Sequence, residues 1–351
     1  MNLEMISDGL IVGFYFAEDR LIHRGFDLSS GRFLEVDKSL VAIPNGEGSV
    51  RKAASIIKEF YIDRLGRPVV GVGLAVPTSI LELDQHSDRY GTLGGQLAPI
   101  GWKNFNAKQT LLDELSSCGV SLAEPEKIGI ISQVGATAKG HFKQHFGTPA
   151  SKPSHPLKND KRSYLYIVAD EGIGAASYNS GWLLHGSAVP NIGHSMVIPI
   201  DGDIPKTCKF HPRRPCLNAY ASLDAIYARH PEILELPNKF IDCNDHSIIS
   251  GVAHYIAQTV SNLVLFMSPQ KIILGGRIAD NPYFLGHFIE NLSLLLENDE
   301  EFDELSYPQL KDFWSMVEYQ GDKDFGVNGA VWTAYEFVDR AGDITNLDRQ
   351  Q

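Results

Sequence analysis

Cysteine is scarce in this chain of 351 residues, which contains four cysteines and twelve histidines. The opening residues, MNLEMISDGLIVGFYF, show no basic segment before the apolar run and no small-residue cleavage site. We therefore expect no secretory leader and place the protein in the cytoplasm, where thiols stay reduced. A fold held by disulfides is excluded on this reasoning, and Cys118 and Cys243 are predicted to be unreactive free thiols.

Basic residues are in the minority, with 31 lysines and arginines against 43 aspartates and glutamates and a formal net charge of −12. Nucleic-acid phosphates favour a basic face, so we expect no nucleic-acid partner. No apolar run approaches the roughly 20 residues that span a bilayer, so we expect no membrane partner. No repeat of solenoid length is present either.

Apolar runs bounded by polar residues predict buried strands, and apolar positions at helical spacing predict amphipathic helices. The predicted strands are residues 10–16, 21–27, 69–76, 128–132, 163–169, 174–178 and 271–274, and the predicted helices are residues 49–65, 107–118, 134–146, 250–266 and 325–337. The glycine-rich stretch 90–102 is predicted to be a loop. Strands and helices that alternate in this way indicate an α/β fold with a mixed sheet in each of two lobes.

The lobes are separated by composition and by the order of the predicted elements. We place an N-terminal α/β lobe at residues 1–134, completed by a C-terminal helix at about 325–351. The C-terminal α/β lobe then covers residues 135–324 and includes a zinc-binding loop at 194–216. With 43% hydrophobic residues, the chain can bury a core in each lobe.

Four potential metal ligands lie close together in the second lobe. Cys208, His211 and Cys216 fall within one proline-rich loop, and His194 precedes them in a Gly-His pair. Two thiolates and two imidazoles complete the tetrahedral set of a structural zinc site. The alternatives are two buried cysteines beside unrelated surface histidines, or a disulfide between Cys208 and Cys216, which a reducing compartment disfavours. The sequence predicts zinc.

The same region resembles the ROK family of sugar kinases and sugar-responsive repressors. The resemblance rests on the Gly-His pair, the Cys/His cluster and the tail Cys-Leu-Asn-Ala-Tyr-Ala-Ser at residues 216–222, where the family has Cys-Leu-Glu-Ala-Tyr-Ala-Ser. It is nearest to the bacterial fructokinase branch and extends over nearly the whole chain. It implies a two-lobed, actin-like and ribonuclease-H-like sugar kinase fold with ligands in an interdomain cleft.

The catalytic segment of this family reads Asn-Asp-x-Asn-Ala-Ala-Ala-x-Gly-Glu, and its Asp is the general base. Here the matching segment runs from Ser132 to His141, and the Ala/Gly frame places Gln133 at the position of the base. An amide cannot accept a proton at neutral pH. A general base commonly contributes about 10²–10⁴-fold in rate, so the resemblance implies that phosphotransfer is lost or feeble.

The resemblance also assigns a sugar site to Ser132, Asn191, His194 and Asn218. Asn191 and Asn218 stand where the family has Glu. Amides still donate and accept hydrogen bonds, so the site is expected to bind a sugar or sugar derivative. Because this site carries less negative charge than the site of the family, it repels an anionic ligand less.

The nucleotide loops depart from the family pattern as well. The first phosphate loop corresponds to residues 13–19, where Tyr15 and Ala17 replace an acidic residue and a glycine. The second keeps Gly172 and Gly174 but begins with two acidic residues, and an ordinary turn between strands explains these glycines equally well. The adenosine-side turn keeps Gly275 and Gly276. We do not expect ATP and magnesium as cofactors; structural zinc is the expected one.

Three classes of function remain. We predict a sugar-binding sensor or non-catalytic subunit that forms a homo-oligomer or assembles with an active paralogue. The alternative is an active ATP-dependent hexose kinase similar to fructokinases, which transfers a phosphoryl group to an alcohol. A fold adapted to another reaction is less favoured. So is a transcription regulator, because the first predicted strand begins near residue 10 and leaves no room for a winged helix.

Overall fold

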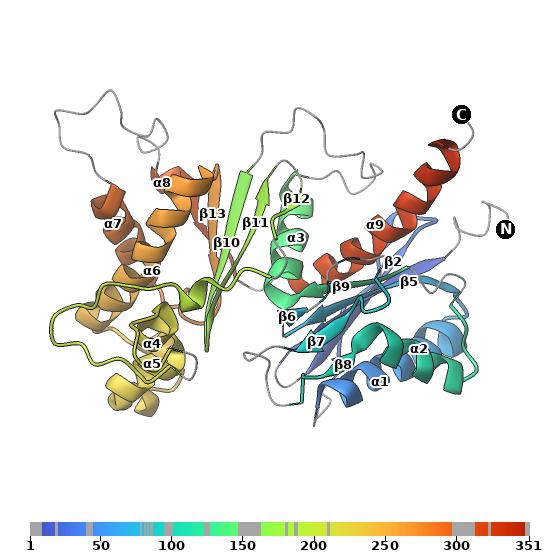
Figure 1. Cartoon of the computed structure of the whole chain (residues 1–351), viewed down its shortest axis with the longest axis horizontal. Helices are drawn as coiled ribbons and strands as arrows, with labels where there is room; N and C mark the ends of the chain where they lie inside the picture. Colours follow the sequence, from blue (N-terminus) through green and yellow to red (C-terminus); the bar gives the residue numbers. More distant parts are fainter. Residues whose placement is uncertain are drawn as a thin grey trace. The chain divides into compact units, whose positions relative to one another are not determined.

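Figure 1 shows the computed structural model of the chain. The structure describes residues 9–17, 20–39, 45–77, 79–80, 82, 84, 87–94, 101–122, 127–146, 163–179, 182–185, 189–208, 211–296, 313–321 and 324–347. The chain divides into two compact units. The first is made of Met1–Lys158, His185–Val189 and Asp324–Gln351, and the second of Asn159–Leu184 and Pro190–Lys323. Each unit has strands and helices in alternation, as predicted.

The first unit extends further along the chain than the boundary expected at residue 134. Helix α3 (Gln133–Phe146) belongs to it, because α3 packs against α9 (Phe325–Leu347). The side chain of Lys139 on α3 lies 2.8 Å from a carboxylate oxygen of Glu336 on α9. The backbones also meet closely, since a Cβ added to Gly140 would overlap the carbonyl of Phe325. The expected boundary was placed just after the predicted strand 128–132, and the sequence gives no local sign that α3 packs against α9.

The first unit is built on a six-stranded sheet with the order β3-β2-β1-β5-β9, in which β4 also pairs with β2. Its strands are β1 Leu10–Phe16, β2 Leu21–Asp27, β3 Arg32–Phe33, β4 Asp37–Ser39, β5 Val69–Val76 and β9 Ile128–Ser132. A hairpin joins β1 to β2, whereas β5 and β9 run parallel to β1. A small sheet contains β6 Ser79–Ile80, β7 Thr92–Gly94 and β8 Phe105–Asn106. The short strand β7 lies within the stretch predicted to be a loop.

Helices cover both faces of the six-stranded sheet. On one face lie α1 (Gly46–Ile56), which continues as a π-helical segment to Arg64, and α2 (Ala107–Ser117). Both helices begin at asparagine caps, and the side chain of Asn106 accepts a hydrogen bond from the N–H of Gln109 at 2.9 Å. Alternate residues of β1 point into this core, because successive side chains of a strand face opposite sides.

The other face receives α9 through a row of glycines. Gly13, Gly73 and Gly129 lie opposite one another on β1, β5 and β9. A Cβ added to Gly73 would overlap the carbonyl oxygen of Ala330 on α9. The missing side chains therefore let the helix backbone lie directly on the sheet, which a larger residue at any of the three positions would prevent.

The second unit contains a five-stranded sheet with the order β12-β11-β10-β13-β14. Its strands are β10 Ser163–Ala169, β11 Ile173–Asn179, β12 Trp182–Leu183, β13 Lys271–Gly275 and β14 Val317–Tyr319, and its helices are α4 Leu217–Ala221, α5 Leu223–Arg229, α6 His246–Met267, α7 Phe284–Leu296 and α8 Phe313–Met316. The hairpin β10–β11 is antiparallel, and β13 runs parallel to β10.

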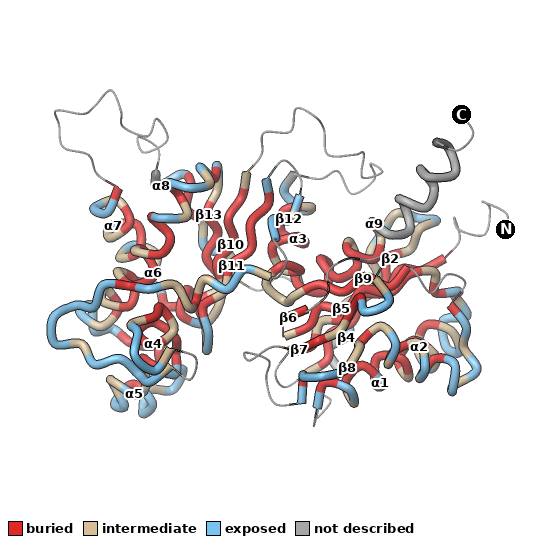
Figure 2. Tube along the Cα trace, viewed as in Figure 1, coloured by how far each residue is buried: buried red, intermediate tan, exposed pale blue. Residues whose placement is uncertain are grey.

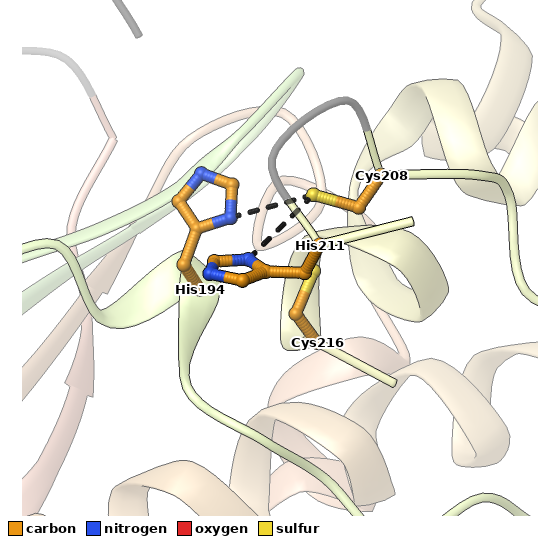
Figure 3. Close-up of side chains that lie close together, drawn as sticks. All are labelled: His194, Cys208, His211 and Cys216. Carbon is orange, nitrogen blue, oxygen red and sulfur yellow. Dashed lines mark hydrogen bonds between the residues drawn. The ribbon is translucent and has the colours of Figure 1, made fainter. Parts of the chain in front are cut away.

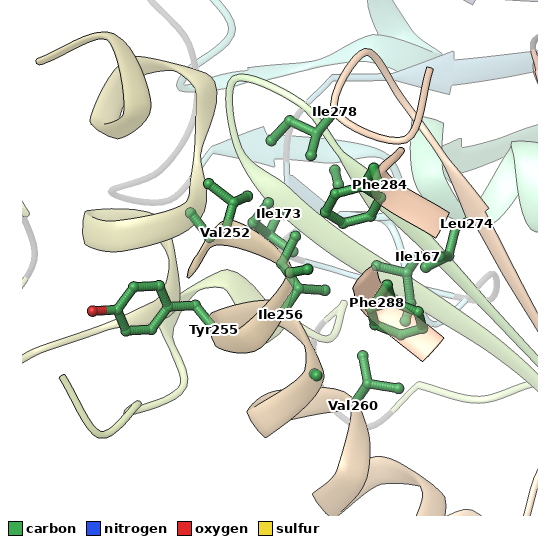
Figure 4. Close-up of a cluster of buried hydrophobic side chains, with 14 of the residues drawn as sticks. Ile167, Ile173, Val252, Tyr255, Ile256, Val260, Leu274, Ile278, Phe284 and Phe288 are labelled. Carbon is green, nitrogen blue, oxygen red and sulfur yellow. The ribbon is translucent and has the colours of Figure 1, made fainter. Parts of the chain in front are cut away.

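Helix α6 forms the centre of the second unit's core. Its residues Val252, Ile256 and Val260 pack with Ile167 of β10 and Phe288 of α7 (Figure 4). Figure 2 shows the buried strands β10, β11 and β13 beside this helix. Within the described part of the chain, α6 alone is long and apolar enough to cross a membrane, but more than half of its most apolar stretch is buried inside the unit.

Candidate functional site

Four side chains that could bind a metal ion meet at one point of the second unit, as the sequence predicted. The ligand atoms of His194, Cys208, His211 and Cys216 all lie within 4.8 Å of one another. The sulfur of Cys208 is 3.6 Å from Nδ1 of His194 and 3.9 Å from Nδ1 of His211 (Figure 3). We name these four residues the Cys–His cluster.

A short stretch of antiparallel pairing brings two of these ligands together. Met196 pairs with Cys216 in an isolated β-bridge, and the N–H of Leu217 donates to the carbonyl of Ser195 at 2.9 Å. The hydroxyl of Ser195 lies 3.0 Å from that of Thr259, which fixes the stretch on α6. His194 and Cys216 are therefore adjacent in space although 22 positions separate them in sequence.

The spacing of the ligand atoms fits a tetrahedral zinc ion. Bonds of about 2.3 Å to sulfur and about 2.05 Å to nitrogen at tetrahedral angles separate the two ligand atoms by about 3.6 Å. The sulfur–nitrogen distances of 3.6 and 3.9 Å agree with this value. Four protein ligands also complete the coordination of zinc, which is the arrangement of a structural rather than a catalytic site.

The protonation states of the metal-free cluster follow from its partial burial. Burial raises the pKa of the Cys216 thiol to about 11, and this effect outweighs the main-chain N–H groups of Ala219 and Asn218 that favour the thiolate. Burial and the nearby His211 lower the pKa of His194. A divalent cation would reverse the balance at sulfur, because it binds the thiolate and displaces the proton.

Two of the predicted sugar-site residues flank this cluster. The side chain of Asn218 accepts a hydrogen bond from the N–H of Ile173 at 2.7 Å, and Gly193 packs directly against the same amide. Asn218 therefore connects α4 to the start of β11. Asn191 precedes the short turn that carries His194, and its side chain is exposed. Asn191, His194 and Asn218 therefore lie in one region of the second unit, near the Cys–His cluster.

The other two predicted site residues, Ser132 and Gln133, belong to the first unit at the junction of β9 and α3. The hydroxyl of Ser132 accepts a hydrogen bond from the N–H of Gly135 at 3.2 Å and so caps the helix. The amide nitrogen of Gln133 donates a hydrogen bond to the carbonyl of Phe16 at the end of β1. Gln133 thereby connects two strand ends across the sheet.

An ion-pair network joins the two glycine turns of the second unit. Asp170 follows β10, and Arg277 follows the turn after β13. One carboxylate oxygen of Asp170 accepts a hydrogen bond from Nε of Arg277 at 2.8 Å, and the other accepts from its main-chain N–H at 3.1 Å. Glu171 lies 3.0 Å from the same guanidinium. These hydrogen bonds raise the pKa of Arg277 further, so its guanidinium stays charged.

The four glycines assigned to nucleotide loops have different structural roles. Gly276 adopts a φ of +91°, and a side chain there would overlap the carbonyl of Ala169. Gly275 packs against the hydroxyl of Tyr166. Gly172 lies in the turn of the β10–β11 hairpin with open space around it, and Gly174 is a paired residue of β11. Local packing thus accounts for Gly275 and Gly276, whereas it does not require glycine at 172.

The first expected phosphate loop begins inside a strand. Gly13 and Tyr15 are residues of β1, and the ring of Tyr15 fills the space beside Gly326 of α9. Glu18 and Asp19 lie outside the described residues. Tyr15 at this place is therefore a packing residue between the sheet and α9.

Sequence reasoning missed the partner of Asp170. It identified the two acidic residues as unfavourable to a phosphate but did not connect them to Arg277, because 107 positions separate the two. The only available signal was a basic residue directly after a glycine pair that follows a predicted strand.

Comparisons with known proteins agree with the resemblance found in the sequence. The sequence profile of the ROK family matches residues 155–317, which cover most of the second unit. The chain is 24% identical to the fructokinase of Streptococcus mutans over 275 residues, which cover 76% of this chain and 78% of that protein.

Two solved structures are similar over almost their full length. The ROK hexokinase of Thermus thermophilus has a TM-score of 0.65 and 19% sequence identity, and the match covers 94% of this chain and 99% of that one. The ROK family glucokinase of Streptomyces griseus, crystallised with glucose and AMPPNP, has a TM-score of 0.63 and 17% identity, over 93% and 100% of the two chains. The chain therefore has the two-lobed, actin-like fold of these sugar kinases.

Proposed function

Because the chain is a distant member of the ROK family and has the fold of its sugar kinases, we propose that it binds a sugar or sugar derivative without ATP-dependent phosphotransfer. In this proposal the protein is a sensor or a non-catalytic subunit of the cytoplasm. It acts as a homo-oligomer or together with an active paralogue. Its Cys–His cluster holds a structural zinc ion.

The observation that carries the proposal is the state of Gln133. The resemblance of residues 132–141 to the family segment places Gln133 at the position of the general base. An amide has no basic lone pair that could accept the proton of a sugar hydroxyl. Its nitrogen donates to the carbonyl of Phe16, so the side chain already serves the junction of β1 and α3. The Gln133 side chain therefore has a structural role and cannot remove a proton from a sugar hydroxyl.

The network around Asp170 supports the loss of nucleotide binding. A phosphate group bound at main-chain N–H groups and a nearby cation would need the donors that Asp170 already uses, namely the N–H and the guanidinium of Arg277. Glu171 adds a second negative charge at the same turn. A triphosphate would have to displace one carboxylate and approach another, which like-charge repulsion opposes.

The sugar-binding part of the proposal rests on the amides and the imidazole near the Cys–His cluster. The exposed amide of Asn191 offers both a donor and an acceptor to sugar hydroxyls. The oxygen of the Asn218 amide accepts from Ile173, and its NH₂ group can donate to a ligand. Zinc would fix His194 between them, and a fixed ligand shell lowers the entropy lost on binding.

Two measurements test the proposal. A coupled assay at high protein concentration with ATP and fructose, glucose, mannose or amino sugars is expected to give no turnover above roughly 1 s⁻¹, the low end of ordinary enzymes. In a thermal-shift screen, a sugar or sugar derivative is expected to raise the melting temperature, whereas ATP with magnesium is not. The variant Asn191→Ala should abolish the sugar shift and leave the melting temperature of the free protein unchanged.

An active hexose kinase remains the second candidate, and the fructokinase similarity over three quarters of the chain favours it. It requires a base other than Gln133. Turnover that survives in Gln133→Ala would establish this candidate, because a base at another position does not depend on that side chain. Turnover together with a nucleotide-dependent thermal shift would contradict the proposal of a non-catalytic protein.

A further inference from the structure

Outside the Cys–His cluster, a second pair of histidines faces one another at the surface of the second unit. Nδ1 of His246 lies 2.9 Å from Nε2 of His287. His246 is the first residue of α6, and His287 lies in the first turn of α7. We propose that this pair binds a divalent transition-metal ion of the nickel or copper class, held by one nitrogen from each helix. This inference does not depend on the proposed function.

The separation of the two nitrogens selects the geometry of the ion. Two ligands at right angles, with metal–nitrogen bonds of about 2.05 Å, lie about 2.9 Å apart, whereas tetrahedral angles separate them by about 3.3 Å. The observed 2.9 Å is the length of the hydrogen bond between the two rings in the metal-free protein, and the same separation suits neighbouring positions of a square-planar or octahedral ion. Nickel(II) and copper(II) prefer these geometries with nitrogen ligands, and zinc prefers the tetrahedral one.

One neighbour of the pair favours a particular tautomer of His287. A carboxylate oxygen of Glu290 lies 3.7 Å from Nδ1 of His287 and favours the proton on that nitrogen. The lone pair of His287 is then on Nε2, which faces His246. In the metal-free protein His246 donates its Nδ1 proton to this lone pair. When the metal binds Nδ1 of His246, the proton moves to Nε2 of the same ring.

Packing holds both rings in place. The ring of Tyr283 contacts His246 with 4.8 Å between centroids. One turn further along, the amide of Asn291 donates to the carbonyl of His287 at 2.8 Å and to the hydroxyl of Ser250 at 3.4 Å. The two helices are therefore fixed side by side about one turn beyond the histidine pair. Both ligand nitrogens are pre-positioned, and water molecules can complete the coordination because His246 is exposed.

The positive ends of the two helix dipoles oppose a cation at this place. The metal must also replace the hydrogen bond between the two imidazoles. Negative charge offsets part of this cost, because the carboxylate of Asp245 caps α6 directly beside His246 and Glu290 lies beside His287. Two nitrogen–metal bonds outweigh the remainder, since bidentate attachment makes the second bond intramolecular.

The test uses the full chain with its Cys–His cluster loaded with zinc and the excess removed. Titration calorimetry with NiCl₂ should show one nickel ion per chain, bound more tightly than added zinc. His246→Gln and His287→Gln should each weaken nickel binding about 10-fold or more, and Glu290→Gln by less than the histidine changes. His254→Gln is the matched control, because it removes another histidine of α6 that is hydrogen-bonded to α7 through Asn291.

Nickel at concentrations above its dissociation constant should also raise the melting temperature of the wild type and of His254→Gln, but not of the two variants in the pair. Equal nickel affinity in His246→Gln, His287→Gln and His254→Gln would overturn the proposal. So would the absence of nickel binding by the wild type, or a preference for zinc over nickel. Because His246 is exposed, its variant should fold, and circular dichroism checks that it does.

Discussion

Arg277 binds both oxygens of the Asp170 carboxylate, one with its side chain at 2.8 Å and the other with its main-chain N–H at 3.1 Å. Asp170 accepts a further hydrogen bond from the N–H of Glu171 at 2.8 Å. An internal carboxylate thus uses donors of the kind that bind phosphate groups in other proteins. Asp170 accepts several hydrogen bonds, whereas its neighbour Glu171 makes one ion pair with Arg277, so substitutions at the two positions can be compared directly.

Asp170→Asn should lower the free energy of unfolding by about 1 kcal/mol, because it weakens several charge-assisted hydrogen bonds at once. Glu171→Gln is the control and should change the free energy of unfolding by less than about 0.5 kcal/mol, since a single exposed ion pair contributes little. Urea denaturation at low and high salt measures both. Equal effects for the two substitutions would contradict the central role of Asp170.

Gln133→Glu should destabilise the first unit by about 1–3 kcal/mol. The substitution keeps the size of the side chain but places a carboxylate oxygen against the carbonyl of Phe16, where the amide nitrogen now donates. Gln144 is exposed on the same helix, and Gln144→Glu should stay within about 0.5 kcal/mol of the wild type. Denaturant unfolding followed by fluorescence compares them, and similar curves for both variants would refute the bridging role.

Gly73→Ala should destabilise the protein by more than about 3 kcal/mol or prevent folding, because the added methyl group overlaps the carbonyl oxygen of Ala330. Gly286→Ala should have the opposite sign. Gly286 lies on the exposed side of α7 with open space around it, so alanine should stabilise by about 0.5–1 kcal/mol. Thermal unfolding of the two variants tests the pair of signs.

Acidic pH should lower the free energy of unfolding of the first unit, because His23 is buried. This residue is 2% exposed, and burial lowers its pKa, with the carboxylate of Asp37 acting in the opposite direction. The native state then binds fewer protons than the unfolded state below the unfolded pKa of about 6.5. Stability is complete above that pH and falls as the pH drops from there to the folded pKa, by up to about 1.4 kcal/mol per pH unit.

His23→Gln should remove this slope from the pH dependence of the unfolding free energy. Asp37→Asn should lengthen the declining range, because it removes the charge that favours protonated His23. Unfolding by urea between pH 4.5 and 7.5 gives the slopes. A slope unchanged in His23→Gln would assign the acid sensitivity to other groups.

The Cys–His cluster should retain about one zinc ion per chain after purification. Cys208→Ser should lose that ion and lower the melting temperature of the second unit, because the ligand set drops from four to three. Cys118→Ser is the control, since Cys118 lies in the first unit and outside the cluster. Elemental analysis reads out the metal, and zinc retained by Cys208→Ser would refute this assignment.

The sequence predicted local features well where one residue pattern decided them. The run from Leu10 to Phe16 forms the predicted strand, because a short apolar run between polar borders favours a buried strand. The Cys–His cluster was also predicted, since three of its ligands fall within one short loop. In both cases the information lies within a few consecutive residues.

Features that depend on distant parts of the chain were not predictable in this way. Gly13, Gly73 and Gly129 form a row only once the register of three strands is known. The pairing of His246 with His287 requires α6 and α7 to start side by side, and α7 itself was not predicted. The first unit extends past the boundary expected near residue 134 for the same reason, because α3 contacts a helix almost 200 positions later.

The packing of α9 on the glycine row also determines when the first unit can be completed during synthesis. Its sheet emerges from the ribosome early, but the helix that covers one face is translated only after all strands of the second unit. Until then, that face stays open to chaperones and to premature association, while the second unit can already acquire its structure. Helix α9, which is synthesised after the sheet of the first unit, thus completes the core of that unit.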